Sequence, residues 1–380
     1  MQREVNPLPS PTEKIGEAEI YTGRGLLAAL PEAVDGMTGG GRVLLVRDGE
    51  GRETAGRAEE LLKGFGFRVT AKDAADADEA EECCLLSLGI GGREAAEAAK
   101  RAARKLGAEC ALFPVVPCED GLLKGGGVRA VYLDDDVLDS SPADSRAAAA
   151  GIVLSVPVRK FEDAYAAKVL AEKPVNEWDF SFSEEEPLSS CALKVIRTGA
   201  AEGVYAPDVT ADMLRSIACA RGRAPRRKGE YVFVAACALA AFYKAYLSSP
   251  AIDTLVPADH GAALDEIARL TGGEKGKLMQ AFDIFDVSGY FRINYILGEY
   301  RMDLLSELSS ADLGGAERKW RRMYDDAGFW MKSAFTSADM IRAMALGGEL
   351  SGGLLALAAA TGFFGAMTPE EKTGDKKKTA

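Results

Sequence analysis

The sequence contains a single histidine and no pair of cysteines spaced as Cys-x-x-Cys. One histidine cannot build a multi-histidine metal site, so any metal would need carboxylates or thiolates as ligands. The seven cysteines are scattered, and several stand in apolar runs, which indicates buried thiols in a reducing compartment. We therefore expect a cytoplasmic protein in which a divalent metal is doubtful and His260 is the one histidine available for acid–base chemistry.

The sequence also lacks a signal peptide, a long uncharged apolar run and an excess of basic residues. Its first residues have no apolar segment, Tyr231–Leu247 contains Lys244, and Leu354–Met367 is too short to span a bilayer. The net charge of −12 opposes contact with phosphate backbones. We expect no membrane and no nucleic-acid partner, and the basic stretch 221–228 is either a solvated loop or a local anion site.

The length of 380 residues suits two domains. Arg42–Val46 is an apolar run without alternation, as in a central parallel strand, and Thr54–Phe65 follows with apolar residues at helical spacing. Strands and helices alternate in this way up to about residue 133, which predicts a parallel sheet. The predicted strands are Glu19–Gly25, Arg42–Val46, Phe67–Thr70, Cys83–Leu88, Cys110–Val116 and Ala130–Leu133, and the helices between them include Leu26–Val34, broken by Pro31, and Arg93–Leu106.

The second half has helical patterns throughout, apart from a polar, proline-containing connection at Glu172–Ser190. The predicted fold is therefore an α/β Rossmann-like parallel-sheet domain followed by an all-α domain. The expected divisions are an N-terminal arm at 1–18, a nucleotide-binding domain at 19–146, a helical domain at 147–367 and a disordered tail at 368–380. The predicted helices are Val158–Ala171, Thr210–Ala220, Tyr231–Ser248, Ala262–Thr271, Lys277–Phe285, Tyr290–Leu308, Gly315–Asp326, Thr336–Met344 and Leu350–Ala360.

Two features point to the carboxyl edge of the predicted sheet. The Gly89–Gly92 turn ends an apolar strand and opens a helix, so it is either a phosphate cradle or a tight turn with no ligand. Asp48 ends the first strong strand, where an acid can bond a ribose hydroxyl or simply cap a turn.

Two further segments carry residues with chemical potential. The strand-end loop Phe113–Gly121 is stiffened by prolines and contains Asp120, so it is typical of an active-site wall or of a rigid connection. His260 adjoins Asp259 in Val256–Gly261. We take His260 and Asp120 as the candidate acid–base residues.

The order of these landmarks resembles a known family. The segments EIYTGRGLLAALPE, GRVLLVRDGEG, LGIGG, FPVVPCEDG, VYLDDDVLDSSP and AAAAG follow one another as in the dehydroquinate synthase-like and iron-containing alcohol dehydrogenase superfamily. The nearest family is that of sn-glycerol-1-phosphate dehydrogenase. The resemblance extends over residues 19–155 and only patchily into the helical half.

This resemblance implies an NAD(P) cofactor and a small-molecule substrate in a cleft between two domains, with a homodimer as the inferred assembly. An acid at position 48 favours NAD over NADP. The resemblance implies that the cofactor contacts lie at Asp48, Gly89, Gly91, Gly92, Cys118 and Gly121.

The sequence departs from the family at the residues that matter most for chemistry. Ile90 and Gly92 stand where the family's turn has a glycine and a hydroxyl residue, and Ala95 and Ala98 replace an aspartate and a lysine. The metal-binding aspartate expected after AAAAG is replaced by the apolar run 152–154. Without a metal, a proton donor would have to stabilise the alkoxide.

Three functions stay open at this point. The first is an NAD(P)-dependent oxidoreductase that acts on a small polyol or polyol phosphate. The second is a non-catalytic binding or regulatory protein that kept the fold but lost the metal site. The third is a metal-independent lyase or cyclase acting on a sugar phosphate.

Overall fold

The computed structural model describes residues 9–80, 83–172, 176–178, 181–183, 185–249, 260–273, 287–324 and 335–364. The chain divides into two compact units. The first, here the sheet unit, contains residues 1–154 and 179–202, and the second, here the helical unit, contains residues 155–178 and 203–380. The predicted helix Lys277–Phe285 and the predicted tail 368–380 lie outside the described residues.

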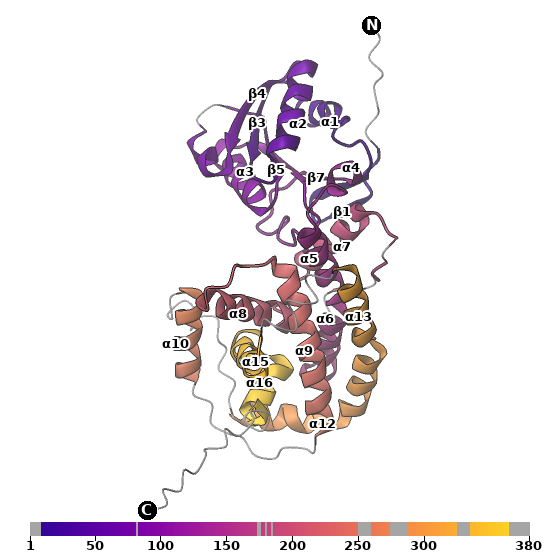
Figure 1. Ribbon diagram of the computed structural model, residues 1–380, viewed down its shortest axis with the longest axis vertical. Helices are drawn as coiled ribbons and strands as arrows, with labels where there is room; N and C mark the ends of the chain where they lie inside the picture. Colours follow the sequence, from indigo (N-terminus) through magenta and orange to yellow (C-terminus); the bar gives the residue numbers. More distant parts are fainter. Residues whose placement is uncertain are drawn as a thin grey trace, which may run out of the picture. The chain divides into compact units, whose positions relative to one another are not determined.

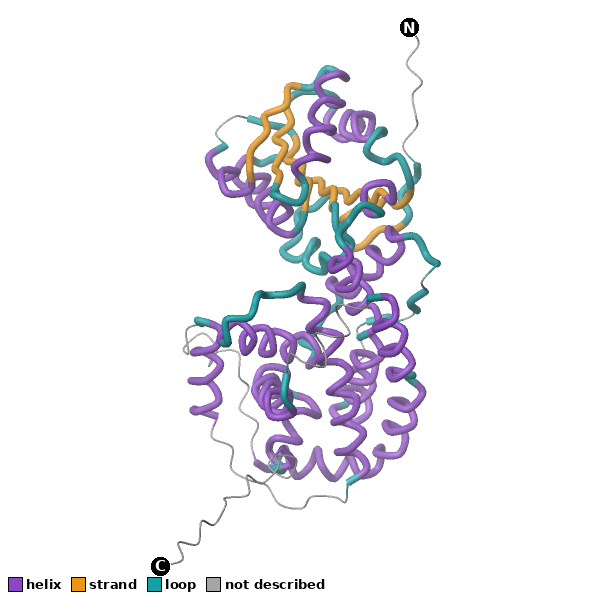
Figure 2. Tube along the Cα trace, in the orientation of Figure 1, coloured by secondary structure: helices purple, strands orange, loops and turns teal. Residues whose placement is uncertain are grey.

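A seven-stranded sheet forms the centre of the sheet unit, with the strand order β1-β2-β7-β6-β5-β3-β4. Every neighbouring pair is parallel except β1 with β2 (Figure 2). The predicted α/β architecture is therefore confirmed. The strands are β1 (Glu13–Ile15), β2 (Ala18–Gly23), β3 (Arg42–Arg47), β4 (Arg68–Asp73), β5 (Leu86–Gly91), β6 (Glu109–Pro114) and β7 (Ala130–Asp134).

Helices cover both faces of this sheet (Figure 1). On one face, α1 (Leu30–Thr38), α2 (Arg52–Phe65) and α5 (Ala143–Leu154) contribute to a core with Leu45, Leu88 and Phe113. On the other, α3 (Arg93–Leu106) and the 3-10 helix η1 (Ala74–Glu79) pack their alanines on Val46 and Leu112. Burial on both faces explains why these strands are continuous apolar runs.

Two local predictions are corrected near the amino terminus. Pro31 was expected to break a helix at Leu26–Val34, but it stands in the first turn of α1, where its missing N–H leaves no bond unmade. Part of the expected arm at 1–18 also joins the sheet, because Glu13–Ile15 pairs antiparallel with β2 and forms the edge strand.

The boundary between the units falls after Leu154, whereas the sequence placed the change of domain at residue 147. Helix α5 packs on the sheet, and a helix that the sequence did not predict, α7 (Leu188–Ala200), returns to the sheet unit. Residues Ala192 and Ile196 of α7 join the core on the α3 side. The signal was available, because apolar residues at 192, 195 and 196 have helical spacing.

The helical unit contains no strand among its described residues. Its helices are built around α9, the largest part of which is buried, and aromatic residues such as Phe242 and Tyr246 fill its core. The predicted helices at 210–220, 231–248 and 262–271 are confirmed, and each begins two to four residues earlier than expected. The elements are α6 (Val156–Tyr165), the π-helix η2 (Ala166–Leu170), α8 (Ala206–Ala220), α9 (Lys228–Ser248), α10 (His260–Thr271), α12 (Val287–Ser310), α13 (Leu313–Met323), α15 (Ser337–Ser351) and α16 (Gly353–Ala360).

By length and composition alone, α9 could cross a membrane, and α15 with α16 would pass the same test as one span bent by 115°. In the structure, 67% of the apolar window of α9 is buried inside the protein. Burial in the core of the helical unit therefore accounts for its apolar sequence.

Candidate functional site

The strand order creates a topological switch point between β3 and β5. The chain leaves β3 for β4 on one side and later returns to form β5 on the other side of β3. In open α/β sheets, ligands bind in the crevice outside the carboxyl ends of such strands. The structure brings Asp48, which follows β3, and Gly91–Gly92, which end β5, together at this point.

The Asp48 carboxylate is already bonded to the backbone of this crevice. Its Oδ2 accepts hydrogen bonds from the N–H of Gly92 at 2.8 Å and of Ala95 at 3.2 Å. Its Oδ1 accepts bonds from the N–H of Glu50 at 3.1 Å and of Gly51 at 3.0 Å. One carboxylate thus caps the amino end of α3 and holds the loop that leads into α2, and these four bonds fill the acceptor capacity of its two oxygens.

The glycines of the turn make room for this carboxylate. Gly91 has φ +151°, and a Cβ there would lie 2.3 Å from Asp48 Oδ1. Gly51, in the loop after β3, lies so close to β5 that its Cβ would stand 2.1 Å from the carbonyl oxygen of Ile90. Backbone therefore lies directly against backbone, which favours the tight turn over the phosphate cradle of the two alternatives that the sequence left open.

The expected turn at Gly89–Gly92 is shorter than predicted, because β5 continues to Gly91. Gly89 pairs with Val46 and Leu112 inside the sheet, and a Cβ on it would lie 2.9 Å from Cβ of Ala99. Gly89 is therefore a packing glycine beneath α3. Ile90 is an ordinary strand residue, so the positive φ that a β-branched residue would resist falls on Gly91 instead.

The loop after β6 holds the other predicted residues of the sheet unit. Cys118 is only 9% exposed and belongs to the core on the α1–α2 face, so its thiol packs inside the protein. The backbone of Asp120 lies against α7, where a Cβ on Gly199 would stand 1.5 Å from the Asp120 carbonyl oxygen. Gly121 has no atom within 4 Å of its Cβ position.

The second predicted acid–base residue belongs to the other unit. His260 is the first residue of α10, and its side chain lies outside the described part of the structure. The acid–base roles of His260 and Asp120 therefore stay predictions. Among the described residues, no group of three or more histidine, cysteine, aspartate or glutamate side chains could hold a metal ion.

The residues at the switch point do not fit the pyrophosphate of a dinucleotide. A phosphate at the amino end of α3 would compete with Asp48 for the N–H groups of Gly92 and Ala95, which the carboxylate already engages. Two more carboxylates lie close, because a Cβ on Gly92 would stand 2.5 Å from Glu50 Oε2 and 3.5 Å from Glu119 Oε1. An anion there would meet like charges.

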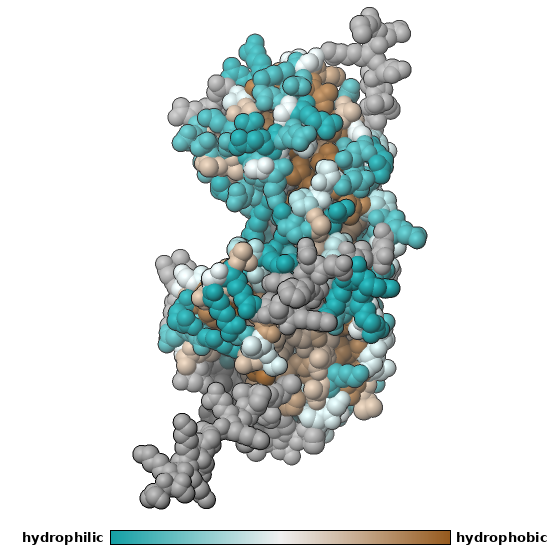
Figure 3. Space-filling model, in the orientation of Figure 1, coloured by the Kyte–Doolittle hydropathy of each residue, from teal (hydrophilic) through white to brown (hydrophobic). Residues whose placement is uncertain are grey.

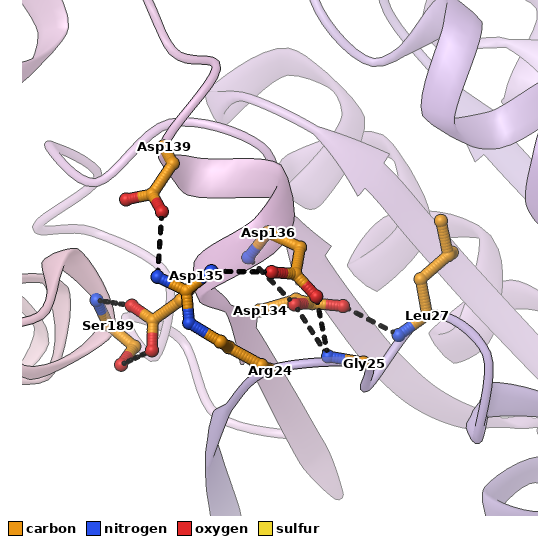
Figure 4. A network of polar contacts seen from close by, with 8 residues as sticks. All are labelled: Arg24, Gly25, Leu27, Asp134, Asp135, Asp136, Asp139 and Ser189. Carbon is orange, nitrogen blue, oxygen red and sulfur yellow. Dashed lines mark hydrogen bonds and ion pairs between the residues drawn. The ribbon is translucent and has the colours of Figure 1, made fainter.

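A second cluster of carboxylates lies at the carboxyl end of β7 (Figure 4). Asp134, which ends β7 and is 1% exposed, accepts bonds from the N–H of Gly25, Leu27 and Asp136. Removal from water raises the pKa of Asp134, and these three amides oppose the rise.

The next residue of this cluster ties α7 to the sheet. Both oxygens of Asp135 are bonded by Ser189, through its N–H at 2.8 Å and its hydroxyl at 3.0 Å. Arg24 pairs with Asp136 and Asp139 at the surface. The LDDDVLD segment is therefore a structural joint between the loop after β2, the end of β7 and α7 (Figure 4).

Sequence reasoning missed a polar cluster inside the helical unit. Arg159 of α6, which is 3% exposed, pairs with Asp208 at 2.8 Å. One turn on, Glu162 accepts bonds from the Tyr243 hydroxyl at 2.6 Å and the Ala206 N–H at 3.0 Å. Removal from water raises the pKa of Glu162 to about 7. Charged residues beside the inward-facing Val158 and Phe161 were the available signal.

Basic residues of the stretch 221–228 form ion pairs with nearby carboxylates. Arg221 pairs with Asp339, Arg226 with Glu230 at 2.8 Å, and Lys228 with Asp208 at 3.6 Å. These carboxylates neutralise much of the local positive charge, which favours the loop over the anion site.

A hollow of about 550 Å³ lies between α1 and α2 and is lined by Leu27, Pro31, Leu61 and Phe65, with Glu32, Arg57 and Glu60 among its polar residues. None of the residues that the sequence singled out lines it. Figure 3 shows apolar side chains gathered in places on the otherwise hydrophilic surface of the sheet unit. The hollow is thus separate from the switch-point crevice.

No protein-family model matches the chain. Over 171 residues it is 23% identical to glycerol-1-phosphate dehydrogenase [NAD(P)+] of Methanospirillum hungatei, a match that covers 43% of this chain and 48% of that protein. The chain thus spans about half the length of this curated relative. The match confirms the resemblance that the ordered motifs indicated.

Solved structures with a related arrangement include two dehydrogenases. Glycerol dehydrogenase from Schizosaccharomyces pombe is 12% identical with a TM-score of 0.49, covering 82% of this chain and 93% of that one. NADH-dependent butanol dehydrogenase A from Thermotoga maritima is 13% identical with a TM-score of 0.44, covering 89% and 100%. With TM-scores below 0.5, these likenesses add nothing about function to the sequence match.

Proposed function

We propose that this protein is a non-catalytic binding or regulatory protein built on a polyol-dehydrogenase scaffold. The observation that carries the proposal is the Asp48 carboxylate, which engages the two α3 amides that a cofactor phosphate would need. A nicotinamide dinucleotide held by this turn would have to displace both bonds and accept Glu50 and Glu119 as neighbours. The residues at the switch point therefore hold the loop after β3 against α3, and they are poorly suited to bind the cofactor that hydride transfer requires.

The test is a binding and turnover assay on the full chain. Melting temperature is measured with NAD(H) and NADP(H) at millimolar concentration, with and without Zn²⁺, Mg²⁺ or Fe²⁺. Absorbance of the reduced cofactor is followed with glycerol, glycerol 1-phosphate and dihydroxyacetone phosphate. We expect no cofactor-dependent stabilisation and no change in absorbance. Saturable cofactor binding with turnover would contradict the proposal.

The second candidate is an NAD(P)-dependent oxidoreductase acting on a small polyol or polyol phosphate. The specific support is the sequence match to glycerol-1-phosphate dehydrogenase [NAD(P)+], a relative named for its use of NAD(P)+. The meeting of Asp48 and the glycine turn at the switch point is a second support, since this is where such folds bind dinucleotides. On this candidate, Asp48 would have to release the α3 amides when cofactor binds.

Either candidate takes a small molecule as its partner, and a homodimer in the cytoplasm is the assembly that the family resemblance favours. Light scattering coupled to size-exclusion chromatography checks the dimer, for which a mass near twice 40.3 kDa is expected. A mass of a single chain at micromolar concentration would contradict it.

A further inference from the structure

We infer that the Asp48 carboxylate takes the place of the cofactor phosphate that this fold otherwise binds, so that a side chain of the protein itself closes the site. The inference rests on the proposed function and deepens it, because it assigns the loss of cofactor binding to one residue. The cofactor that the fold implies and the residues that stand at its site disagree, and the disagreement has a defined atomic origin.

The first step of the argument is the identity of the donors. An anion at the amino end of a helix is held by N–H groups that have no partner within the helix. At α3 these include the N–H of Gly92 and of Ala95, and both point at Asp48 Oδ2. The carboxylate has the charge and the acceptor oxygens that a phosphate would bring, so it satisfies the same donors without a ligand.

The second step is the fit of the backbone around Asp48. Any side chain on Gly91 would collide with this carboxylate, since its Cβ would lie 2.3 Å from Oδ1 and 2.6 Å from Cγ of Asp48. The other oxygen bonds tie Asp48 to Glu50 and Gly51 of its own loop. The turn and the loop therefore close on the carboxylate from both sides, and its position is held by four bonds rather than one.

The third step is electrostatic. Glu50 Oε2 and Glu119 Oε1 approach the Cβ position of Gly92 to 2.5 Å and 3.5 Å. If Asp48 swung away, a phosphate at Gly92 would still face these two carboxylates. Asp48 blocks the donors directly, and its neighbours add repulsion.

The experiment compares variants of the full chain in which a negatively charged side chain is replaced by an uncharged one. The readout is ligand binding, which does not depend on enzymatic activity. Asp48→Ala vacates the α3 amides, and Asp48→Asn removes the charge but keeps one acceptor oxygen. Asp48→Ala/Glu50→Gln removes a second charge. The matched control is Glu94→Ala, which removes an exposed carboxylate from the first turn of the same helix and leaves Asp48 in place. The probes are ADP, NADH and inorganic phosphate, measured by calorimetry, with circular dichroism to establish that each variant is folded.

We expect no saturable binding of any probe to the wild type or to Glu94→Ala. Asp48→Ala should bind ADP at least about tenfold more tightly than the weakest affinity that the assay detects, a gain of at least about 1.4 kcal/mol over the wild type. Asp48→Asn should show a smaller gain, and the double variant a larger one. If Asp48→Ala binds inorganic phosphate as tightly as ADP, the freed site recognises the phosphate group and not the nucleoside. That result also supports the inference.

Two outcomes overturn the inference. If folded Asp48→Ala and the double variant bind no better than the wild type, another part of the chain excludes the cofactor, and the proposed function survives. If Glu94→Ala gains as much as Asp48→Ala, general charge rather than occupation of the amides controls binding. Tight NADH binding by the wild type would instead remove the proposed function itself, so the two failures are distinguishable.

Discussion

The sheet unit and the helical unit hold their buried and partly buried carboxylates in different ways. In the sheet unit, Asp48 accepts four backbone N–H bonds and Asp134 accepts three. In the helical unit, Glu162 accepts one backbone N–H and one tyrosine hydroxyl. Backbone donors are thus plentiful at one kind of site and scarce at the other.

The reason lies in where each architecture leaves amides unpaired. The carboxyl ends of parallel strands lead into loops and helix amino ends, whose first N–H groups have no partner within the helix. Along a helix bundle, nearly every amide is used by the helix itself. Backbone amides therefore oppose the rise in pKa that burial causes at Asp134, whereas Glu162, with one backbone donor, has its pKa raised to about 7.

The largest effect is expected for Asp134→Ala. Three buried or partly buried N–H groups, of Gly25, Leu27 and Asp136, would lose their acceptor. We expect a loss of about 4 kcal/mol in the free energy of unfolding, measured by urea denaturation. Asp139→Ala is the control, because its exposed carboxylate pairs with the surface residue Arg24. Equal losses in both variants would refute a special role for backbone amides.

The next largest effect is expected at Glu162, whose contribution to the free energy of unfolding should depend on pH. Its pKa rises from 4.5 to about 7 on folding, so the folded state favours the protonated acid. The stabilising contribution is complete below pH 4.5 and is lost as the pH rises to about 7, a change of about 3.4 kcal/mol. Arg159 and Asp208 are the neighbouring charges that modulate it.

The measurement is the difference in unfolding free energy between wild type and Glu162→Gln from pH 4.5 to 8. Glutamine keeps an acceptor for the Ala206 N–H and cannot ionise. The free energy of unfolding of Glu162→Gln should rise relative to that of the wild type across this range. A constant difference would mean that Glu162 is ionised in the folded protein at all these pH values.

A smaller effect is expected for Asp48→Ala on stability. The residue caps α3 and holds the loop before α2, but its side chain is only partly buried, so water can enter the space that the carboxylate leaves. We expect a loss of about 1.5 kcal/mol, measured by thermal and urea denaturation. A loss as large as that of Asp134→Ala would show that solvent does not replace the carboxylate.

The smallest effect is expected for Arg24→Ala. Its guanidinium pairs with Asp136 and Asp139, but all three side chains are at least half exposed. Surface ion pairs of this kind contribute little, because water and salt screen them. The melting temperature should stay within experimental error of the wild type, and a clear drop would show that the pair positions the loop after β2.

Patterns local in sequence were sufficient for most of the elements. The apolar runs at 42–46 and 110–116 predicted β3 and β6, and the spacing in 54–65 predicted α2 with its glycine cap. Periodicity reports burial directly, so such elements are readable from a single chain. Helix α7 was missed because it adjoins a polar, proline-rich connection, although its apolar spacing was present.

The residue types and strand ends also predicted that Asp48 and the glycine turn would lie at the same edge of the sheet. Their relation could not be predicted, because an acid near a helix amino end is equally suited to bind a ribose or to cap the helix. That choice depends on distances between segments 43 residues apart, which follow from how β3 packs beside β5. The sequence therefore identified the members of the site, and the packing of two neighbouring strands determined that they bind one another.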